Sequence, residues 1–164
     1  MVRGGRTLFV PTFAVVALLA WSSSAASSEL SELQSLSTQE RSLLLAVNQA
    51  RAVHGAPPLR IGVRLQQAAR AHSRAMMRSG SFTHGNWYRR LRRHGVRART
   101  LGETIAWGVG TDGSAAALVG MWLASPPHRS TLLRRSFRRI GVGIAVGPMG
   151  GFPGATVATA DFAG

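Results

Sequence analysis

The chain has 164 residues with 20 basic and 6 acidic side chains, so its formal net charge is +14 at pH 7. This length suits a single domain, and a hydrophobic content of 45% is enough to close a core. The mean hydropathy lies near zero, which argues against a membrane-embedded bundle. All the basic residues are arginines and cysteine is absent, which excludes both disulfides and lipid attachment through a cysteine.

The first 26 residues have the order of regions typical of a secretory signal peptide. MVRGGR carries two arginines, the apolar run LFVPTFAVVALLAW follows, and small residues come next, with Ser24 and Ala26 favouring cleavage after Ala26. The run is shorter than the roughly 20 residues of a spanning helix and Pro11 interrupts it, so an uncleaved anchor is the minor alternative. We therefore expect an exported protein, secreted or held at the cell envelope, with no transmembrane domain after cleavage.

The folded domain is expected to span residues 37–164, behind a serine-rich segment, 27–36, that is typical of a flexible leader. The sequence S-T-Q-E, from Ser37 to Glu40, predicts a capping box at the start of a helix. Apolar residues at helical spacing continue this helix until His54, where a glycine and two prolines prevent its continuation.

Two more helices are predicted in the middle of the chain. The first runs from about Val63 to Ser79 and is stopped by Gly80. The second begins at a cap that is either Asp112 or Ser114. Its apolar side chains are Leu118, Val119 and Trp122.

The C-terminal part changes to a period of two. Residues 140–147 and 157–162 alternate along their length, which indicates two strands with the turn-rich loop GPMGGFPG between them. Glycine and alanine on one face of the first strand allow a helix or a ligand to approach the sheet closely, and helix packing is the favoured interpretation. Helices followed by strands indicate an α+β fold.

The five histidines lie in different surroundings. His54 lies at a helix end, His94 lies among arginines, and His72 lies on an apolar stripe and is expected in the core, apart from any site. His84 and His128 are predicted in loops, where histidines on rigid supports are better site candidates. Spacing alone gives no metal signal, because neither H-E-x-x-H nor a cysteine cluster is present.

Glu103, in LGETIAWG, is an isolated acid in an arginine-rich stretch. If residues 101–107 form a strand, Glu103 shares a face with Ile105 and Trp107. A carboxylate there needs a partner, because its desolvation is costly. The alternatives are an ion pair with an arginine, a metal ligand, a proton acceptor, or a carboxylate that orients a histidine.

Four ordered blocks within residues 38–162 resemble the bacterial branch of the CAP superfamily. They are LLLAVNQARAVHGAPPLRIGVRLQQAARAHSRAMMRSGSFTHG, LGETIAWG, MWLASPPHRSTLL and FRRIGVGIAVG. The superfamily, also called SCP-like, includes cysteine-rich secretory proteins, insect venom antigen 5 and plant pathogenesis-related proteins. The resemblance implies an α-β-α sandwich, with helical layers on both faces of a small, mainly antiparallel sheet.

The resemblance also implies a site, since the family has a cleft lined by two histidines and two acids. The F-[ST]-H block places the first histidine at His84, and the G-E-N block places the first acid at Glu103, with Thr104 replacing the usual asparagine. The second histidine falls on His128, whereas the position of the second acid holds Ser125. Many family members bind a divalent cation through the two histidines, so we expect His84, His128 and Glu103 to hold Zn²⁺ or a similar ion weakly. Without metal, Glu103 would fix the tautomer of one histidine.

Three functions are compatible with these features. The favoured one is a secreted binding module, a monomer, whose cleft takes a divalent cation or a small or lipidic ligand. A metal-dependent hydrolase that uses His84, Glu103 and His128 as its catalytic residues is the second, and it would need metal-activated water because no serine or cysteine nucleophile is identified.

The third function is adhesion to an anionic envelope surface, either lipid or wall polymer, through unpaired arginines with the cleft inert. Nucleic acid would also bind such charge, but export makes it an unexpected physiological partner. The arginines form two clusters, Arg89, Arg90, Arg92 and Arg93, and then Arg134, Arg135, Arg138 and Arg139.

Overall fold

The computed structural model of the chain describes residue 27 and residues 30–164; the expected signal peptide, residues 1–26, lies outside the described part. The helices are α2 (Thr38–Val53), α3 (Val63–Ser79), α4 (Trp87–Arg93), α5 (Ala115–Ala124) and α6 (Pro126–Leu132), with a 3₁₀ turn, η1 (Gly110–Gly113). The strands are β1 (Arg60–Ile61), β2 (Leu101–Val109), β3 (Arg139–Met149) and β4 (Phe152–Ala163).

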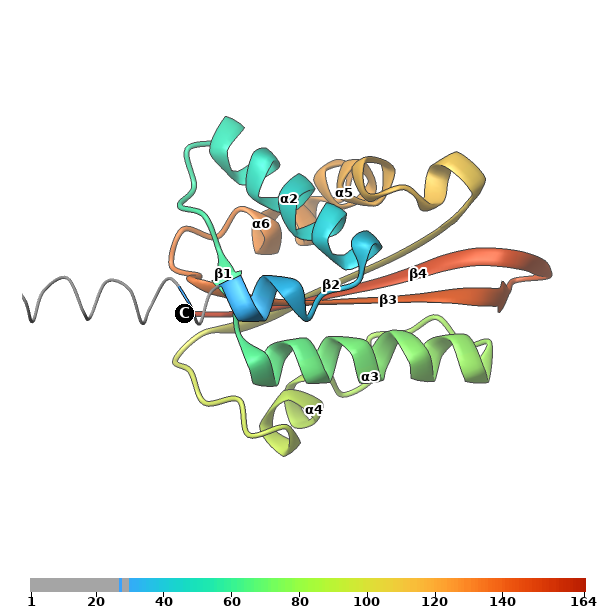
Figure 1. Ribbon diagram of the computed structural model, residues 1–164, viewed down its shortest axis with the longest axis horizontal. Helices are drawn as coiled ribbons and strands as arrows, with labels where there is room; N and C mark the ends of the chain where they lie inside the picture. Colours follow the sequence, from blue (N-terminus) through green and yellow to red (C-terminus); the bar gives the residue numbers. More distant parts are fainter. Residues whose placement is uncertain (1–26, 28–29) are drawn as a thin grey trace, which may run out of the picture.

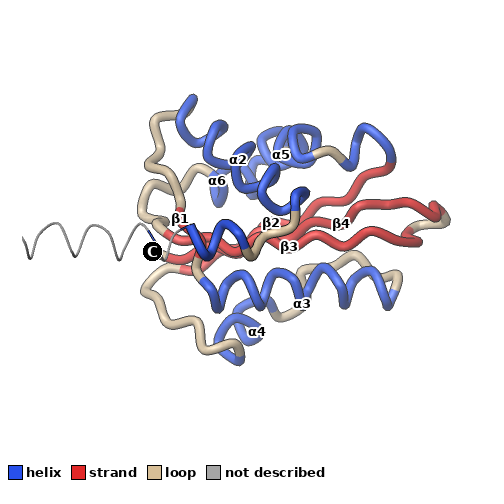
Figure 2. The backbone as a smooth tube through the Cα atoms, in the orientation of Figure 1, coloured by secondary structure: helices blue, strands red, loops and turns tan. Residues whose placement is uncertain are grey.

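The four strands form one sheet in the order β1-β3-β4-β2. The short β1 pairs with β3 in parallel, whereas β3 with β4 and β4 with β2 pair antiparallel. Helices α2, α5 and α6 cover one face of the sheet, and α3 and α4 cover the other (Figure 1, Figure 2). This arrangement confirms the expected α-β-α sandwich with a mainly antiparallel sheet.

Two glycines of β3 set how closely α3 packs on the sheet. A Cβ atom at Gly141 would overlap the backbone of Leu65, and one at Gly143 would overlap the backbone of Ala69. The small face of this strand therefore serves helix packing, as predicted. The close approach also brings the middle of α3, with His72, against the strand pair that carries the candidate site.

The opposite face of the sheet carries the larger core. Trp122 of α5 and Val47 of α2 are fully buried there, and the rings of Phe137 and Phe162 stack at 5.4 Å between centroids. Arg51 is also fully buried, and its guanidinium donates to backbone carbonyls, including the Leu132 oxygen at 2.6 Å. Arg51 thus holds the end of α6 and the segment that leads into β3.

The local signals predict most of these elements well. Both halves of the capping box are present, with the Glu40 amide donating to the Ser37 hydroxyl and the Ser37 amide donating to the Glu40 carboxylate. Ser114, rather than Asp112, caps α5. Order begins ahead of Ser37, because residues 30–34 are helical and Leu36 is buried against the core.

The hairpin between β3 and β4 is longer than the alternation predicted. Both strands continue into the glycine-rich segment, and the chain reverses at Gly150 and Gly151, whose φ angles of 59° and 84° suit glycine. The sequence predicted neither β1 nor α4.

Candidate functional site

Glu103 lies near the start of β2, and both of its carboxylate oxygens have partners. Its side chain is 1% exposed. His84 Nδ1 lies 2.7 Å from Oε1, and Arg90 Nη2 donates to Oε2. Two of the alternatives for this carboxylate therefore apply together, because Glu103 pairs with a partly buried arginine and also orients a histidine.

Arg90 ties the site together from α4, the helix that the sequence did not predict. Asn86 caps this helix by accepting from the Arg89 amide at 2.9 Å. Arg90 Nη1 donates to the backbone oxygen of His84 at 3.2 Å, so the same guanidinium holds Glu103 and the chain at His84. Its side chain is 13% exposed. Arg90 was predicted among mostly unpaired arginines, and the structure corrects this, because burial requires a counter-charge.

The two predicted site histidines face each other. His84 comes from the segment between α3 and α4, and its Nε2 lies 3.3 Å from Nε2 of His128. The predicted loop position of His128 is wrong, because the residue lies in the first turn of α6. Pro126 and Pro127 start this helix, since the fixed φ of proline suits the first helical positions.

The partner of each ring nitrogen fixes the protonation of His84. Nδ1 carries the proton that it donates to Glu103, which leaves the Nε2 lone pair directed at His128. Burial lowers the pKa of His84, and the positive charges of His128 and Arg90 lower it further. Burial also lowers the pKa of His128. Both half-buried imidazoles therefore favour the neutral form, which is the form that binds a cation.

His72 is buried on α3, as predicted, but it is not apart from the site. Its Nε2 lies 3.9 Å from Glu103 Oε2 and has no hydrogen-bond partner among the described residues. Burial, Arg90 and His84 lower the pKa of His72 to about 4, against a hydrogen bond to the Thr83 backbone that raises it. The apolar stripe predicted a buried histidine but not its approach to Glu103, because that approach depends on how α3 crosses the sheet.

Asp161 is a second buried acid beside the site, and no sequence motif indicated it. It lies opposite Glu103 in the pairing of β2 with β4, is fully buried, and neither carboxylate oxygen has a hydrogen-bond partner within the described part of the chain. Arg90 Nη2 lies 3.9 Å from Oδ1. Burial raises the pKa of Asp161 to about 7, and the charge of Arg90 partly opposes this rise.

The donor set fits a cation held by two imidazoles. Zinc bound tetrahedrally, with Zn–N bonds of ~2.0–2.1 Å, needs its nitrogen ligands about 3.3 Å apart, and the two Nε2 atoms are separated by 3.3 Å. Glu103 lies on the other nitrogen of His84, where carboxylates commonly orient a metal-binding imidazole. Over residues 30–164, no three His, Cys, Asp or Glu side chains are arranged to hold a metal together.

The fold agrees with comparisons to known proteins. The sequence profile of the CAP family, described as the Cysteine-rich secretory protein family, matches residues 44–162. The chain belongs to this family, although it contains no cysteine.

Among its relatives, Uncharacterized protein YkwD of Bacillus subtilis (strain 168) is 32% identical over 114 residues, which cover 66% of this chain and 43% of YkwD. Among solved structures, an extracellular protein containing a SCP domain from Bacillus anthracis str. Ames superposes with a TM-score of 0.64 and 26% identity, covering 76% of this chain and 40% of that one. An outer surface protein from Borrelia burgdorferi superposes with a TM-score of 0.62 at 18% identity, covering 73% of this chain and 87% of that one, and this likeness concerns the fold alone.

The chain thus spans less than half of YkwD and of the B. anthracis protein. Within the described residues, no helix has the length and apolar character needed to cross a membrane.

Proposed function

We propose that this chain is an exported binding module whose paired imidazoles, His84 and His128, hold a divalent cation or a small ligand at the cell envelope or outside the cell. The observation that carries the proposal is the chain of contacts from Arg90 to Glu103 to His84, which ends at an imidazole lone pair facing a second imidazole. Each of these contacts supports a site whose imidazole lone pair is oriented toward an electron-poor ligand.

Each side chain has a distinct part in such a site. The two Nε2 atoms would bind the cation, and a bound cation would supply a Lewis acid with positions open for a further ligand. Glu103 fixes the Nδ1–H tautomer of His84 and makes its Nε2 more basic. Arg90 holds the carboxylate in place and compensates its burial.

Export is supported by the expected signal peptide and by the printed descriptions of two structural neighbours as an extracellular and an outer surface protein. Mass spectrometry of the protein in its native host tests this part. A mature N-terminus at Ser27 in the medium or envelope fraction is expected, and intact protein in the cytosol would contradict export.

Isothermal calorimetry with zinc on residues 27–164 tests the site. We expect one weak site at neutral pH, lost in the His84→Ala/His128→Ala double variant and kept in His94→Ala. His94 is a suitable control because it lies at the end of α4 and takes no part in these contacts. Equal zinc binding by the double variant and the parent would place the ion elsewhere. Peptide hydrolysis that requires zinc and both histidines would instead favour the hydrolase function.

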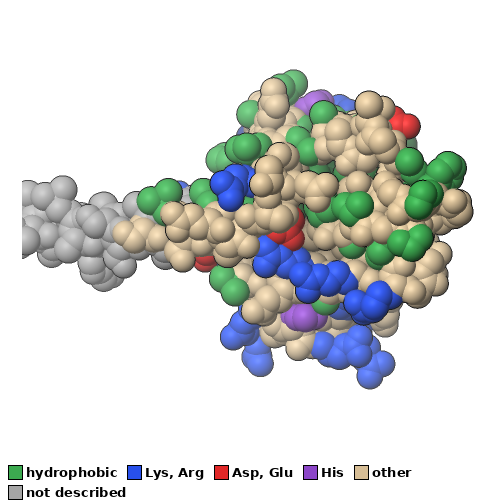
Figure 3. Space-filling model, turned by 45° about the vertical axis from the view of Figure 1, so that its right-hand side comes forward, with side chains coloured by type: hydrophobic (Ala, Val, Ile, Leu, Met, Phe, Trp, Pro, Cys, Tyr) green, Lys and Arg blue, Asp and Glu red, His purple; other side chains and the backbone are tan. Residues whose placement is uncertain are grey.

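The arginine-rich surface supports an anionic partner. Figure 3 shows arginine side chains gathered in a band across one face of the molecule. Helix α3 alone presents exposed arginines at positions 64, 74 and 78. We therefore include adhesion to an anionic envelope surface in the proposed function.

A further inference from the structure

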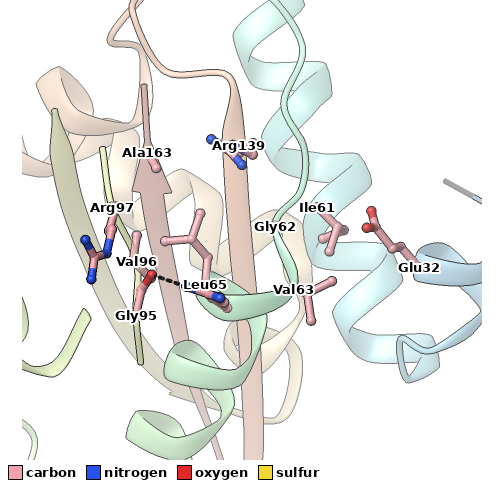
Figure 4. A pocket seen from close by; sticks show the side chains of 11 residues that line it. Glu32, Ile61, Gly62, Val63, Leu65, Gly95, Val96, Arg97, Arg139 and Ala163 are labelled. Atoms are coloured by element: carbon pink, nitrogen blue, oxygen red, sulfur yellow. Dashed lines mark hydrogen bonds between the residues drawn. The ribbon is translucent and has the colours of Figure 1, made fainter. Parts of the chain in front are cut away.

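A cavity of about 490 Å³ lies away from the histidine site, where α3 begins and where β3 starts beside the end of β4 (Figure 4). Neither His84, Glu103 nor His128 lines it. Its size falls within the range of small-molecule sites. Its lining residues come from β1, α3, β3, β4 and the segment before β2, which the fold brings together.

Three arginines line this cavity, one each from α3, the segment before β2, and β3. They are Arg64, Arg97 and Arg139. Arg64 is held in place, because its Nη1 donates to the Gly95 oxygen at 2.7 Å. Gly95 permits this contact, since it has a φ of 72° and a Cβ there would lie 2.7 Å from the Arg64 Nη1 atom.

The other two guanidiniums are exposed at the cavity and available to a ligand. Arg97 and Arg139 are exposed, and neither side chain forms an ion pair or hydrogen bond with another described residue. Among the described residues the lining contains one acid, Glu32, which lies on the Ile61 side of the cavity in Figure 4. Positive charges therefore exceed negative ones, and an anion that joins the arginines would relieve their mutual repulsion.

The rest of the lining is apolar. Ile61, Leu65, Val96 and Ala163 are 7%, 3%, 6% and 2% exposed, so the floor is made by side chains of the core. A purely inorganic anion would leave this floor without a partner. A ligand with an anionic head and a short aliphatic part matches both linings.

We propose that this cavity binds a phosphodiester with an attached glycerol or short aliphatic group. Guanidiniums donate in a planar fork that matches phosphate oxygens, and several of them around one anion give stronger binding than the same charge spread over a surface. A membrane phospholipid and a glycerol-phosphate wall polymer carry this chemistry alike. The inference deepens the proposed adhesion by giving it a site, yet a soluble phosphodiester tests it without any surface.

The test is an NMR titration of residues 27–164 with three probes: inorganic phosphate, glycerophosphoglycerol, and dihexanoyl-phosphatidylglycerol below its micelle concentration. The Arg97→Gln/Arg139→Gln variant removes two cavity charges. The Arg74→Gln/Arg78→Gln variant removes two exposed charges from the other half of α3 and is the matched control. Thermal melts confirm that both fold.

We expect both phosphodiesters to shift cavity amides, and the cavity variant to weaken binding by about tenfold while the control changes it by less than about twofold. Glu32→Gln should strengthen binding, because it removes the acid that the lining contains among the described residues. Tighter binding of the lipid than of glycerophosphoglycerol would identify a membrane phospholipid as the ligand. Equal affinities for the two would identify a glycerol-phosphate wall polymer.

Equal weakening in the two double variants would overturn the site and leave diffuse charge as the cause. The proposed site would also be overturned if neither phosphodiester bound the parent. The same holds if inorganic phosphate bound the parent as tightly as both phosphodiesters do. The His84→Ala/His128→Ala variant should bind the phosphodiesters like the parent, so loss of the zinc site and loss of this cavity are separate results.

Discussion

Glu103 and Asp161 lie directly opposite each other on β2 and β4, and one guanidinium, that of Arg90, serves both buried carboxylates. Removing this cation leaves the two buried acids without their shared positive partner. We expect Arg90→Gln to lower the free energy of unfolding by about 3–5 kcal/mol, as measured by urea denaturation.

Two further variants separate this effect from a general loss of arginine. Arg89→Gln, at an exposed neighbouring position of α4, should cost less than about 0.5 kcal/mol. Asp161→Asn should recover part of the Arg90→Gln loss, with a coupling on the order of 0.5–3 kcal/mol. If Arg90→Gln costs no more than Arg89→Gln, the shared-cation description fails.

His72 and Asp161 should give pH dependences of opposite sign. The pKa of His72 falls in the folded state from 6.5 to about 4, so the unfolded chain binds the extra proton and stability is lost as pH falls below 6.5. The pKa of Asp161 rises from 3.8 to about 7, so the folded state holds the extra proton and stability is lost as pH rises toward 7.

The free energy of unfolding of His72→Gln, taken relative to that of the parent, should therefore be higher at pH 4.5 than at pH 8. The difference should reach up to about 3 kcal/mol, at ~1.4 kcal/mol per pKa unit. Asp161→Asn should show the reverse trend. Urea unfolding across this pH range, with a chelator present, measures both. Parallel pH profiles for parent and variants would refute the two assignments.

Glu103→Gln tests whether the carboxylate orients His84 or only supports the fold. Zinc affinity should fall about 10–100-fold, as for other carboxylates behind metal-binding imidazoles. The ring nitrogens of His84 should also lose their preference for the Nδ1–H tautomer in ¹⁵N NMR spectra. Glu40→Gln is the matched control, because Glu40 is also buried and paired with an arginine, Arg70, at 2.6 Å. A Glu40→Gln loss of zinc affinity equal to that of Glu103→Gln would mean that both act through stability.

Adhesion to anionic surfaces should depend steeply on salt. Loss of residues 1–26 removes Arg3 and Arg6 but no acid, so the mature chain stays strongly basic. Co-sedimentation with anionic liposomes should fall as the Debye length shrinks from ~10 Å at 0.1 M to ~3 Å at 1 M salt. Neutral liposomes are the control, and equal binding to both kinds would point to an apolar contact.

The sequence predicts those parts of the fold that depend on local or periodic signals. The capping box at Ser37 and Glu40 satisfies the backbone within one turn, and the glycines of β3 mark where a helix must approach. The family resemblance brought His84, Glu103 and His128 into one hypothesis, and the structure places their side chains together.

The remaining site residues could not be found this way. Helix α4 reads WYRRLRR and buries only Leu91, so it lacks an apolar stripe and Arg90 looks like any exposed arginine. The neighbours of His72 and Asp161 depend on how α3 and α4 lie against the sheet, over distances that no local pattern encodes. Burial of Asp161 follows from its place in a central strand rather than from its type.

Anomalous diffraction at the zinc edge, on crystals of residues 27–164 soaked in zinc, tests the central claim most directly. We predict a peak between the Nε2 atoms of His84 and His128, within about 2.0–2.1 Å of each, while Glu103 still accepts from His84 Nδ1. A zinc peak at His54, His72 or His94, or no peak between His84 and His128 in crystals soaked in zinc, would contradict the proposed site.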